Sequence, residues 1–131
     1  MSRFAHRPAG LHLLADFHGI DAHKLVSCEA IDALLRAGAR AAGATVLHSH
    51  FHSFGPQQGV TGVLLLAESH ISIHTWPEFG FAAADIFMCG AAEPARALEV
   101  IERALQSASH TLQTIERGPA VEMQSATQST L

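Results

Sequence analysis

Six short segments of the chain have the pattern of a strand, in most cases an alternation of hydrophobic and polar residues and, in residues 60–67, a nearly continuous apolar run typical of a buried strand. Two longer segments repeat with helical spacing. A period of two is typical of a strand with one buried face, whereas apolar residues at i, i+3 and i+4 indicate an amphipathic helix. The predicted strands are Gly10–Phe17, Ala44–Phe54, Val60–Ala67, His70–Trp76, Phe81–Met88 and His110–Glu116. Long helices are predicted from Ser27, a suitable N-cap, to Ala42 and from Pro94, which suits a first turn, to Leu105.

The order of these elements favours a two-layer α+β sandwich. A mostly antiparallel sheet would carry both long helices on one face. The 131 residues suit a single domain, which we place at residues 1–117. Residues 118–131 are polar and small and are predicted to form a disordered tail. No apolar run approaches about 20 residues, so no membrane span is expected.

Composition narrows the class of protein further. Hydrophobic residues make up 48% of the chain and charged residues 15%, which indicates a core-forming domain. The net charge of −4, without a Lys/Arg cluster, argues against nucleic acid as a partner. Cys28 and Cys89 are too few for a disulfide framework, and the start of the chain lacks a secretory signal, so a cytoplasmic protein is expected. Lys24 is the only lysine, which leaves one position for a lysine-bound cofactor such as PLP.

The segment ESHISIHTWPE, residues 68–78, is the most unusual part of the chain. On a strand, Ile71 and Ile73 point to one face, and the opposite face carries two imidazoles, a hydroxyl and an indole. The residues of that opposite face are His70, Ser72, His74 and Trp76. This set suits the wall of a pocket. It is also compatible with a half-exposed strand whose histidines are hydrogen-bonded.

Each residue with a reactive side chain has two possible interpretations, a structural role and a functional role. Ser69 is either a turn residue or a nucleophile that needs a base, for which His70 and His74 are the local candidates. A Ser-His-Asp hydrolase is poorly supported, because the chain has no G-x-S-x-G motif. Cys89, at the end of an apolar strand, is either a buried inert thiol or a group that exchanges a proton at a pocket rim. Cys28 is expected to be structural.

Three further histidines, His48, His50 and His52, share one face of a predicted strand. Three imidazoles can hold zinc with one open position, which is the best case for a metal in this sequence. Alternation with serine and phenylalanine is equally typical of an exposed or interfacial strand, and no nearby carboxylate or cysteine completes the set. We therefore predict no metal site.

The stretch AESHISIHTWPEFGFAAADIFMCG, residues 67–90, closely resembles the prokaryotic S-adenosylmethionine decarboxylase proenzymes. The flanking segments GLHLLADF, GAT, FHSF and GVTGV follow in family order, so the resemblance covers about residues 9–117. It implies a pyruvoyl-dependent carboxy-lyase. Such an enzyme converts S-adenosylmethionine to decarboxylated S-adenosylmethionine and CO₂, and its product supplies spermidine synthesis.

The resemblance also implies that this zymogen makes its own cofactor by autocatalytic cleavage. Ser69 would attack the carbonyl carbon of Glu68 and convert the peptide to an ester. β-Elimination would then release a β chain of residues 1–68, and loss of ammonia would leave a pyruvoyl group on an α chain of residues 69–131. The pyruvoyl ketone would form a Schiff base with the substrate amine and accept electrons when CO₂ leaves.

Other roles carry over from the family position by position. His74 matches the histidine that helps remove the serine-derived α-proton during processing, and Cys89 matches the proton donor in decarboxylation. Glu78 matches the carboxylate that binds the ribose hydroxyls, and Phe54 matches an aromatic ring that stacks on adenine. Thr61 stands where the family usually has a serine that steadies the oxyoxazolidine intermediate. The resemblance implies a homodimer of processed αβ protomers. The strand that carries His48, His50 and His52 is a candidate for part of the dimer interface.

Two departures keep other hypotheses open. Thr61 keeps the hydroxyl but adds a methyl group, which predicts slower processing, and the loop Gly55–Gly59 is slightly longer than usual. One alternative is a pyruvoyl-dependent decarboxylase of ornithine or arginine, although neither substrate would need Glu78 and Phe54. The other is an unprocessed, histidine-rich metal-binding homologue.

Overall fold

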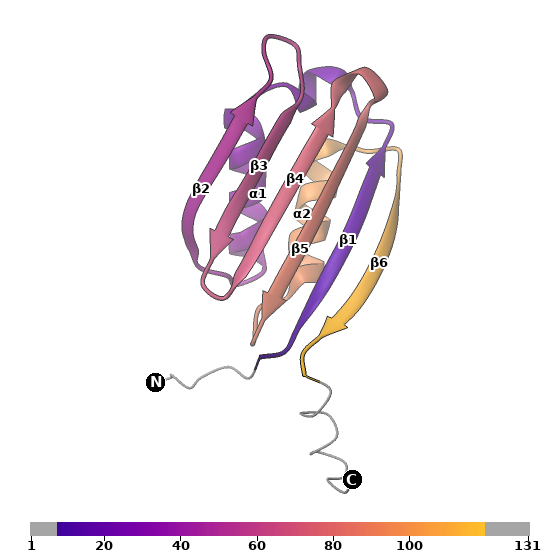
Figure 1. Ribbon diagram of the computed structural model, residues 1–131. Helices are drawn as coiled ribbons and strands as arrows, with labels where there is room; N and C mark the ends of the chain where they lie inside the picture. The colour runs from indigo at the N-terminus through magenta and orange to yellow at the C-terminus, as the bar shows by residue number, and fades with distance from the viewer. Residues whose placement is uncertain (1–7, 120–131) are drawn as a thin grey trace, which may run out of the picture.

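The computed structural model describes residues 8–119, which form one sheet backed by two long helices (Figure 1). The strands are β1 Gly10–His18, β2 Val46–Ser53, β3 Val60–Leu66, β4 Ser69–Trp76, β5 Phe81–Cys89 and β6 Ser109–Arg117. Their order across the sheet is β2-β3-β4-β5-β1-β6, and every neighbouring pair is antiparallel. The predicted α+β two-layer architecture is confirmed.

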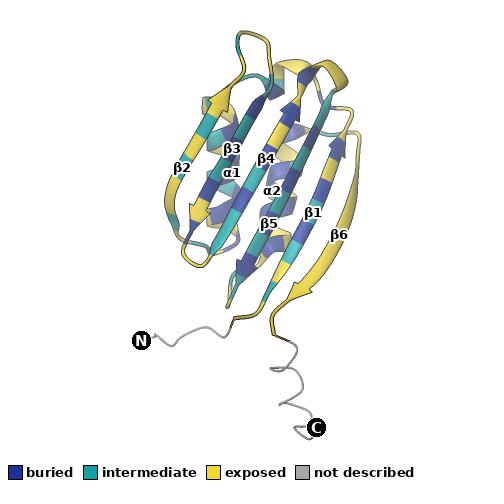
Figure 2. Ribbon diagram, in the orientation of Figure 1, coloured by how far each residue is buried: buried dark blue, intermediate teal, exposed yellow. Residues whose placement is uncertain are grey.

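Helices α1, Cys28–Ala41, and α2, Pro94–Leu105, both cover the same face of the sheet (Figure 1). Ser27 caps α1 as predicted, since its Oγ accepts a hydrogen bond from the backbone N–H of Ala30. The apolar stripes of the helices, with Ile31 and Ile101 fully buried, pack onto alternate residues of the strands (Figure 2). Burial of these stripes holds the helix layer on the sheet.

Two short 3₁₀ helices were not predicted: η1, Ala22–Leu25, and η2, Pro77–Phe79. They lie against each other near the end of β4. From the sequence pattern, Pro77 and Gly80 indicate only a break between two strands. In the structure, Gly80 has a φ of +59° and its N–H bonds to the carbonyl of Pro77, which closes η2.

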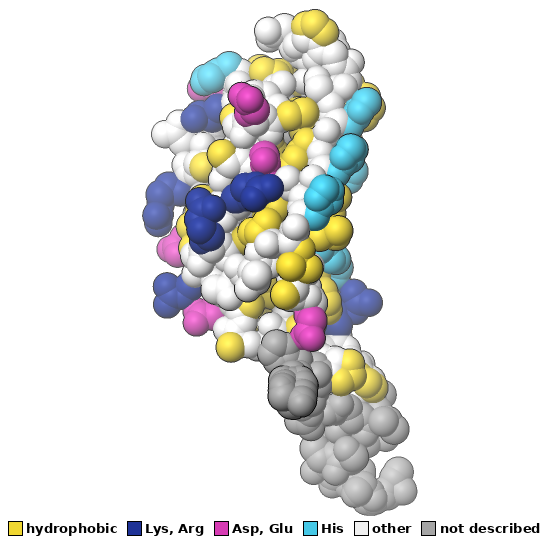
Figure 3. Space-filling view, turned by 90° about the vertical axis from the view of Figure 1, so that its left-hand side faces the viewer, with side chains coloured by type: hydrophobic (Ala, Val, Ile, Leu, Met, Phe, Trp, Pro, Cys, Tyr) yellow, Lys and Arg dark blue, Asp and Glu magenta, His cyan; other side chains and the backbone are white. Residues whose placement is uncertain are grey.

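The face of the sheet opposite the helices, here called the open face, is covered by no helix among residues 8–119 (Figure 1). The register places seven histidines on it: His12, His18, His48, His50, His52, His70 and His74. Figure 3, which looks along the sheet from the β2 edge, shows histidines gathered down one side of the molecule. Leu65, Trp76 and Ile115 share this face and are 46%, 40% and 42% exposed.

The elements of the described residues end close to the predicted limit of the domain at residue 117. Strand β6 ends at Arg117, so the ordered elements reach the predicted boundary. Beyond Gly118 and Pro119, the predicted disordered tail lies outside the described residues. No helix within the described part of the chain is long and apolar enough to cross a membrane.

Candidate active site

Ser69 begins β4 directly after the tight turn that connects it to β3. The turn pairs Leu66 with Ser69 and leaves Ala67 and Glu68 between the strands. Glu68 has a φ of +61°, the left-handed conformation that residues other than glycine rarely adopt. Such a conformation costs about 1–2 kcal/mol. The backbone is therefore strained at the residue that supplies the carbonyl of the 68–69 peptide bond.

Cys89, at the end of β5, lies beside this turn. Its backbone N–H donates a 3.3 Å hydrogen bond to Oγ of Ser69, so the serine hydroxyl is held by the neighbouring strand. Burial, together with the carboxylate of Glu68, raises the pKa of the Cys89 thiol above its ordinary value. The thiol therefore stays protonated at neutral pH and can donate a proton.

Gly10 faces Cys89 across the β1–β5 pair. A Cβ atom at position 10 would lie 2.5 Å from the carbonyl oxygen of Met88 and 3.1 Å from the sulfur of Cys89. The absence of a side chain therefore lets β1 approach β5 and leaves room beside the thiol.

The other predicted site residues meet at the opposite end of β4. A cavity of about 320 Å³ there is lined by Phe54, Gln58, Gly59, Thr61, His74, Thr75, Trp76 and Glu78. It lies within the size range of small-molecule sites. Phe54 is 61% exposed, and its ring meets the edge of His52 at 4.7 Å between centroids. The structure thus brings together Phe54, Thr61, His74 and Glu78, four of the seven predicted residues.

Thr61 and His74 form a pair on neighbouring strands. Oγ1 of Thr61 lies 3.1 Å from Nδ1 of His74, and the two residues are opposite each other in the β3–β4 register. Buried Thr75 fixes this end of the strands, because its Oγ1 accepts from the N–H of Val60 at 2.9 Å and donates to the carbonyl of Leu25 at 2.8 Å. These hydrogen bonds fix the backbone next to Thr61 and His74.

The predicted residues thus form two groups at the two ends of one sheet. Ser69 starts β4 and His74 lies five residues further along it. At about 3.4 Å per residue this separates them by about 17 Å. The expectation that His70 or His74 activates Ser69 as a local base is not supported within one chain, since the hydrogen bond to Oγ of Ser69 comes from Cys89.

A group of polar residues on the open face, here called the Asp85 cluster, was not singled out from the sequence. It consists of His12, His70, Ser72, Asp85 and Arg117, from four different strands. Nε2 of His12 lies 2.9 Å from Oδ2 of Asp85, Nε2 of His70 lies 3.6 Å from the same oxygen, and Ser72 donates to Oδ1. Burial opposes ionisation of Asp85, but the hydrogen bonds from Ser72 and His12 and the charge of His70 outweigh it and lower the pKa of this carboxyl.

The three ligating atoms of His12, His70 and Asp85 lie within 4.8 Å of one another. Arg117, however, donates from Nη1 to Nδ1 of His12 at 3.0 Å. Because arginine only donates, Nδ1 of His12 is the acceptor and Nε2 carries the hydrogen that points to Asp85. The cluster is therefore closed by hydrogen bonds rather than arranged to receive a cation.

The geometry of His48, His50 and His52 does not favour the zinc alternative. Among residues 8–119 the one metal-capable group of three is His12, His70 and Asp85. Alternate residues on a strand are about 6.8 Å apart, so three in a row along an edge strand do not converge on one ion. Their exposure on β2 supports the interfacial reading.

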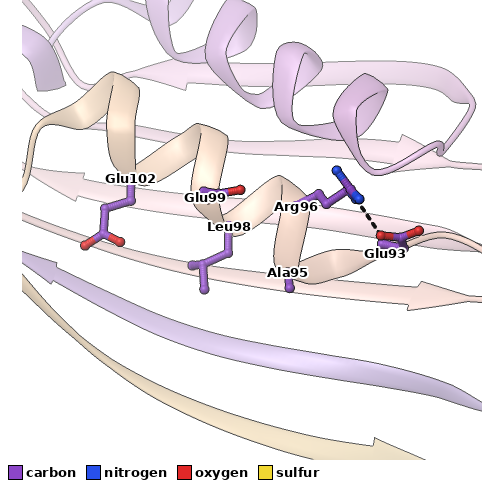
Figure 4. A pocket seen from close by; sticks show the side chains of 6 residues that line it. All are labelled: Glu93, Ala95, Arg96, Leu98, Glu99 and Glu102. Carbon is purple, nitrogen blue, oxygen red and sulfur yellow. Dashed lines mark hydrogen bonds and ion pairs between the residues drawn. The ribbon is translucent and has the colours of Figure 1, made fainter.

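A separate hollow runs along α2 (Figure 4). It is lined by Glu93, Ala95, Arg96, Leu98, Glu99 and Glu102. Nε of Arg96 lies 2.5 Å from Oε1 of Glu93, an ion pair between exposed side chains. Ion pairs between exposed side chains contribute little to the stability of the fold. The hollow lies in the helix layer and does not include any predicted site residue.

One signal in the sequence could have identified the Asp85 cluster. Asp85 is the only charged residue in the otherwise apolar segment FAAADIFMC, at an alternating position that is not in the core. A carboxylate in such a strand requires partners. Which residues supply them depends on strand pairing between distant parts of the chain.

Comparison with known proteins agrees with this geometry. A family model described as S-adenosylmethionine decarboxylase matches residues 11–118. The S-adenosylmethionine decarboxylase proenzyme of Sulfurihydrogenibium sp. is 47% identical over 110 residues, which are 83% of this chain and 82% of that protein. The proenzyme of Aquifex aeolicus is also 47% identical over 110 residues, covering 83% and 81%.

A solved structure shows the same similarity in three dimensions. The crystal structure of the adenosylmethionine decarboxylase from Aquifex aeolicus superposes with a TM-score of 0.78 at 43% identity. The match covers 87% of this chain and 94% of that one.

Proposed function

The chain belongs to the S-adenosylmethionine decarboxylase family, and we propose that it is a self-processing, pyruvoyl-dependent decarboxylase of S-adenosylmethionine. The observation that carries this proposal is the arrangement at the β3–β4 turn. There the hydroxyl of Ser69 is bonded by the backbone of Cys89, directly after a residue in the left-handed conformation.

In this proposal the chain is cleaved between residues 68 and 69. Oγ of Ser69 attacks the carbonyl carbon of Glu68, and the peptide becomes an ester. Strain at Glu68 favours the attack, because the shift to an ester frees the turn from its constrained peptide. β-Elimination then breaks the ester, releases the carboxylate of Glu68 and leaves dehydroalanine, from which water displaces ammonia.

The residues around position 69 fit a pyruvoyl group. Such a group supplies a ketone that condenses with an amine and accepts the electrons released when CO₂ leaves. Cys89, whose backbone is bonded to Ser69, is a candidate acid, and its raised pKa keeps a proton on sulfur at neutral pH. We propose that Cys89 delivers this proton to the former α-carbon of the substrate.

The cavity at the far end of β4 would bind the nucleoside part of the substrate. The exposed ring of Phe54 offers a flat surface to adenine, and the carboxylate of Glu78 offers acceptors to the two ribose hydroxyls. Trp76 lines the same cavity, and aromatic rings attract a sulfonium cation. Ornithine and arginine have neither an adenine to stack on Phe54 nor a ribose diol for Glu78, so this combination of groups favours S-adenosylmethionine.

The separation of Ser69 from His74 supports a homodimer in which each chain completes the other's site. Two open faces that meet about a two-fold axis perpendicular to the strands would set the Ser69 end of one copy against the His74 end of its partner. One such axis creates two equivalent sites. The open face carries exposed Leu65, Trp76 and Ile115, which suit burial in an interface.

Within each composite site, His74 would remove the serine-derived α-proton during processing. Its Nδ1 faces the hydroxyl of Thr61, which leaves Nε2 to accept the proton. Thr61 would donate its hydroxyl hydrogen to the oxyanion that forms when Ser69 attacks. The two residues move together, because they are paired on adjacent strands.

The experiment that tests the proposed function is release of labelled CO₂ from the carboxyl group of three substrates. We expect turnover of S-adenosylmethionine and none above background for ornithine or arginine. Treatment with cyanoborohydride and substrate should label the chain that begins at residue 69 and abolish turnover. Turnover of ornithine or arginine in preference to S-adenosylmethionine would contradict the proposal.

A further inference from the structure

Cleavage between residues 68 and 69 would leave β4 without its covalent connection to β3, and this inference rests on that proposed cleavage. Residue 69 would become a chain end, and chain ends fray unless they are tied down. The first side chain of the new chain that can anchor it is His70. Its backbone pairs with Leu65 on one side and Phe87 on the other.

The ring of His70 is held on three sides by the open face. Its Nε2 lies 3.6 Å from Oδ2 of Asp85. Its centroid lies 5.8 Å from that of Phe87 and 5.8 Å from that of His12, which meets it edge-on. His70 is thus part of a packed arrangement that spans β1, β4 and β5.

Asp85 organises that arrangement. Its two oxygens face His12, His70 and Ser72, so one carboxylate joins β5 to strands on both of its sides. Arg117 fixes the other nitrogen of His12 and lies over the ring of Phe87, 5.8 Å from its centroid. The contacts do not pass through the β3–β4 turn and would survive its cleavage.

We propose that Asp85 is a positioning residue that acts through His70 and keeps residue 69 in place once the chain has been cut. In the uncut chain the turn holds Ser69 covalently, so the cluster contributes little there. In the cut chain the same contacts determine where the new terminus lies relative to Cys89. Replacement of Asp85 should therefore reduce the order of the start of β4 more after cleavage than before cleavage.

The test compares Asp85→Asn in two backgrounds: the self-processed protein and Ser69→Ala, which is expected to stay uncut. Hydrogen exchange is measured at the amides of His70 and Ile71. We expect Asp85→Asn to reduce protection about tenfold in the cut protein and less than about threefold in the uncut one. A charge-assisted contact of about this strength is removed in both, but in the uncut protein the intact β3–β4 turn still holds the start of the strand. In the cut protein kcat for S-adenosylmethionine should fall while KM stays nearly constant.

Asp16→Asn is the matched control, since Asp16 is an exposed carboxylate of β1 on the same face. It should change neither protection nor kcat. His70→Asn is the second variant, in case Asp85→Asn fails to fold, and should give the same difference between backgrounds. Equal losses in cut and uncut protein, or none in either, would overturn the proposal. A wild-type chain found uncut by mass would overturn the proposed function and this inference together.

Discussion

Ser69 and His74 lie on the same strand, yet at opposite ends of the sheet: the hydroxyl of Ser69 is bonded by Cys89, and the imidazole of His74 is bonded by Thr61. A residue to be cut and a histidine that assists the cut must come within hydrogen-bond reach. In the proposed mechanism, the histidine that assists the cut therefore comes from a second copy of the chain.

The first prediction is therefore complementation between two inactive variants. Ser69→Ala lacks the serine and His74→Ala lacks the base, so each alone should stay uncut or be cut very slowly. When the two are co-expressed, mixed dimers hold one complete site, and the His74→Ala chain should be cut. Gel separation of differently tagged chains measures this. Failure of His74→Ala to be cut in the mixture would show that His74 does not act from a partner.

Thr61 provides a second prediction, about the rate of cleavage. Thr61→Val keeps the shape but loses the hydroxyl that faces His74, and cleavage should slow by about 100-fold, as for loss of an oxyanion donor. Thr61→Ser keeps the hydroxyl without the methyl group and should be cut at least as fast as the natural sequence. The time course of chain separation after synthesis measures both. Rapid cleavage of Thr61→Val would remove Thr61 from the mechanism.

The pKa of Cys89 leads to a third prediction. Burial and the carboxylate of Glu68 raise this pKa, so the thiolate appears only at higher pH than for an ordinary cysteine. In a Cys28→Ala background, the alkylation rate should rise with a midpoint above the ordinary value of about 8.5. The alkaline fall of kcat should follow the same group, since a donor is lost as pH rises through its pKa.

Two variants test the effect of the charge beside Cys89 and the role of its thiol in turnover. Glu68→Gln removes the negative neighbour and should lower the alkylation midpoint in uncut Ser69→Ala protein. Cys89→Ala should spare cleavage and reduce turnover. If Cys89→Ala turned over at the natural rate, the thiol would be no more than a packing residue.

Substrate recognition gives the fourth prediction. Glu78→Gln and Phe54→Ala should each raise KM for S-adenosylmethionine by about tenfold, because each removes a contact worth roughly 1.4 kcal/mol. Cleavage of the chain, measured by mass, should remain complete in both. Phe79→Ala is the matched control: Phe79 is 76% exposed and adjacent to Glu78, but it does not line the cavity. An equal effect of Phe79→Ala would mean that the cavity is not the nucleoside site.

Local pattern in the sequence predicts the elements well and the assembled site less well. The alternation around Ile71 and Ile73 predicts which face of β4 is buried, and the cap at Ser27 predicts where α1 begins, because both depend on neighbours in the chain. The position of β1 between β5 and β6 depends on pairing between strands that are far apart in the chain, and the local hydrophobic pattern of each strand does not reveal this pairing. The partners of Asp85 were missed for that reason.

The motif likewise suggests which residues take part in the proposed chemistry without showing how they are arranged. The string from Glu68 to Glu78 contains the proposed cleavage site, the proposed processing histidine and the proposed ribose-binding carboxylate. Because the string forms β4, its two ends lie about the length of that strand apart.

Intact mass of the purified protein under denaturing conditions shows whether the chain has been cut between residues 68 and 69. We expect two polypeptides, residues 1–68 and residues 69–131, the second with a pyruvoyl group in place of Ser69 and no free amine. A single uncut chain that retains Ser69 would contradict this expectation.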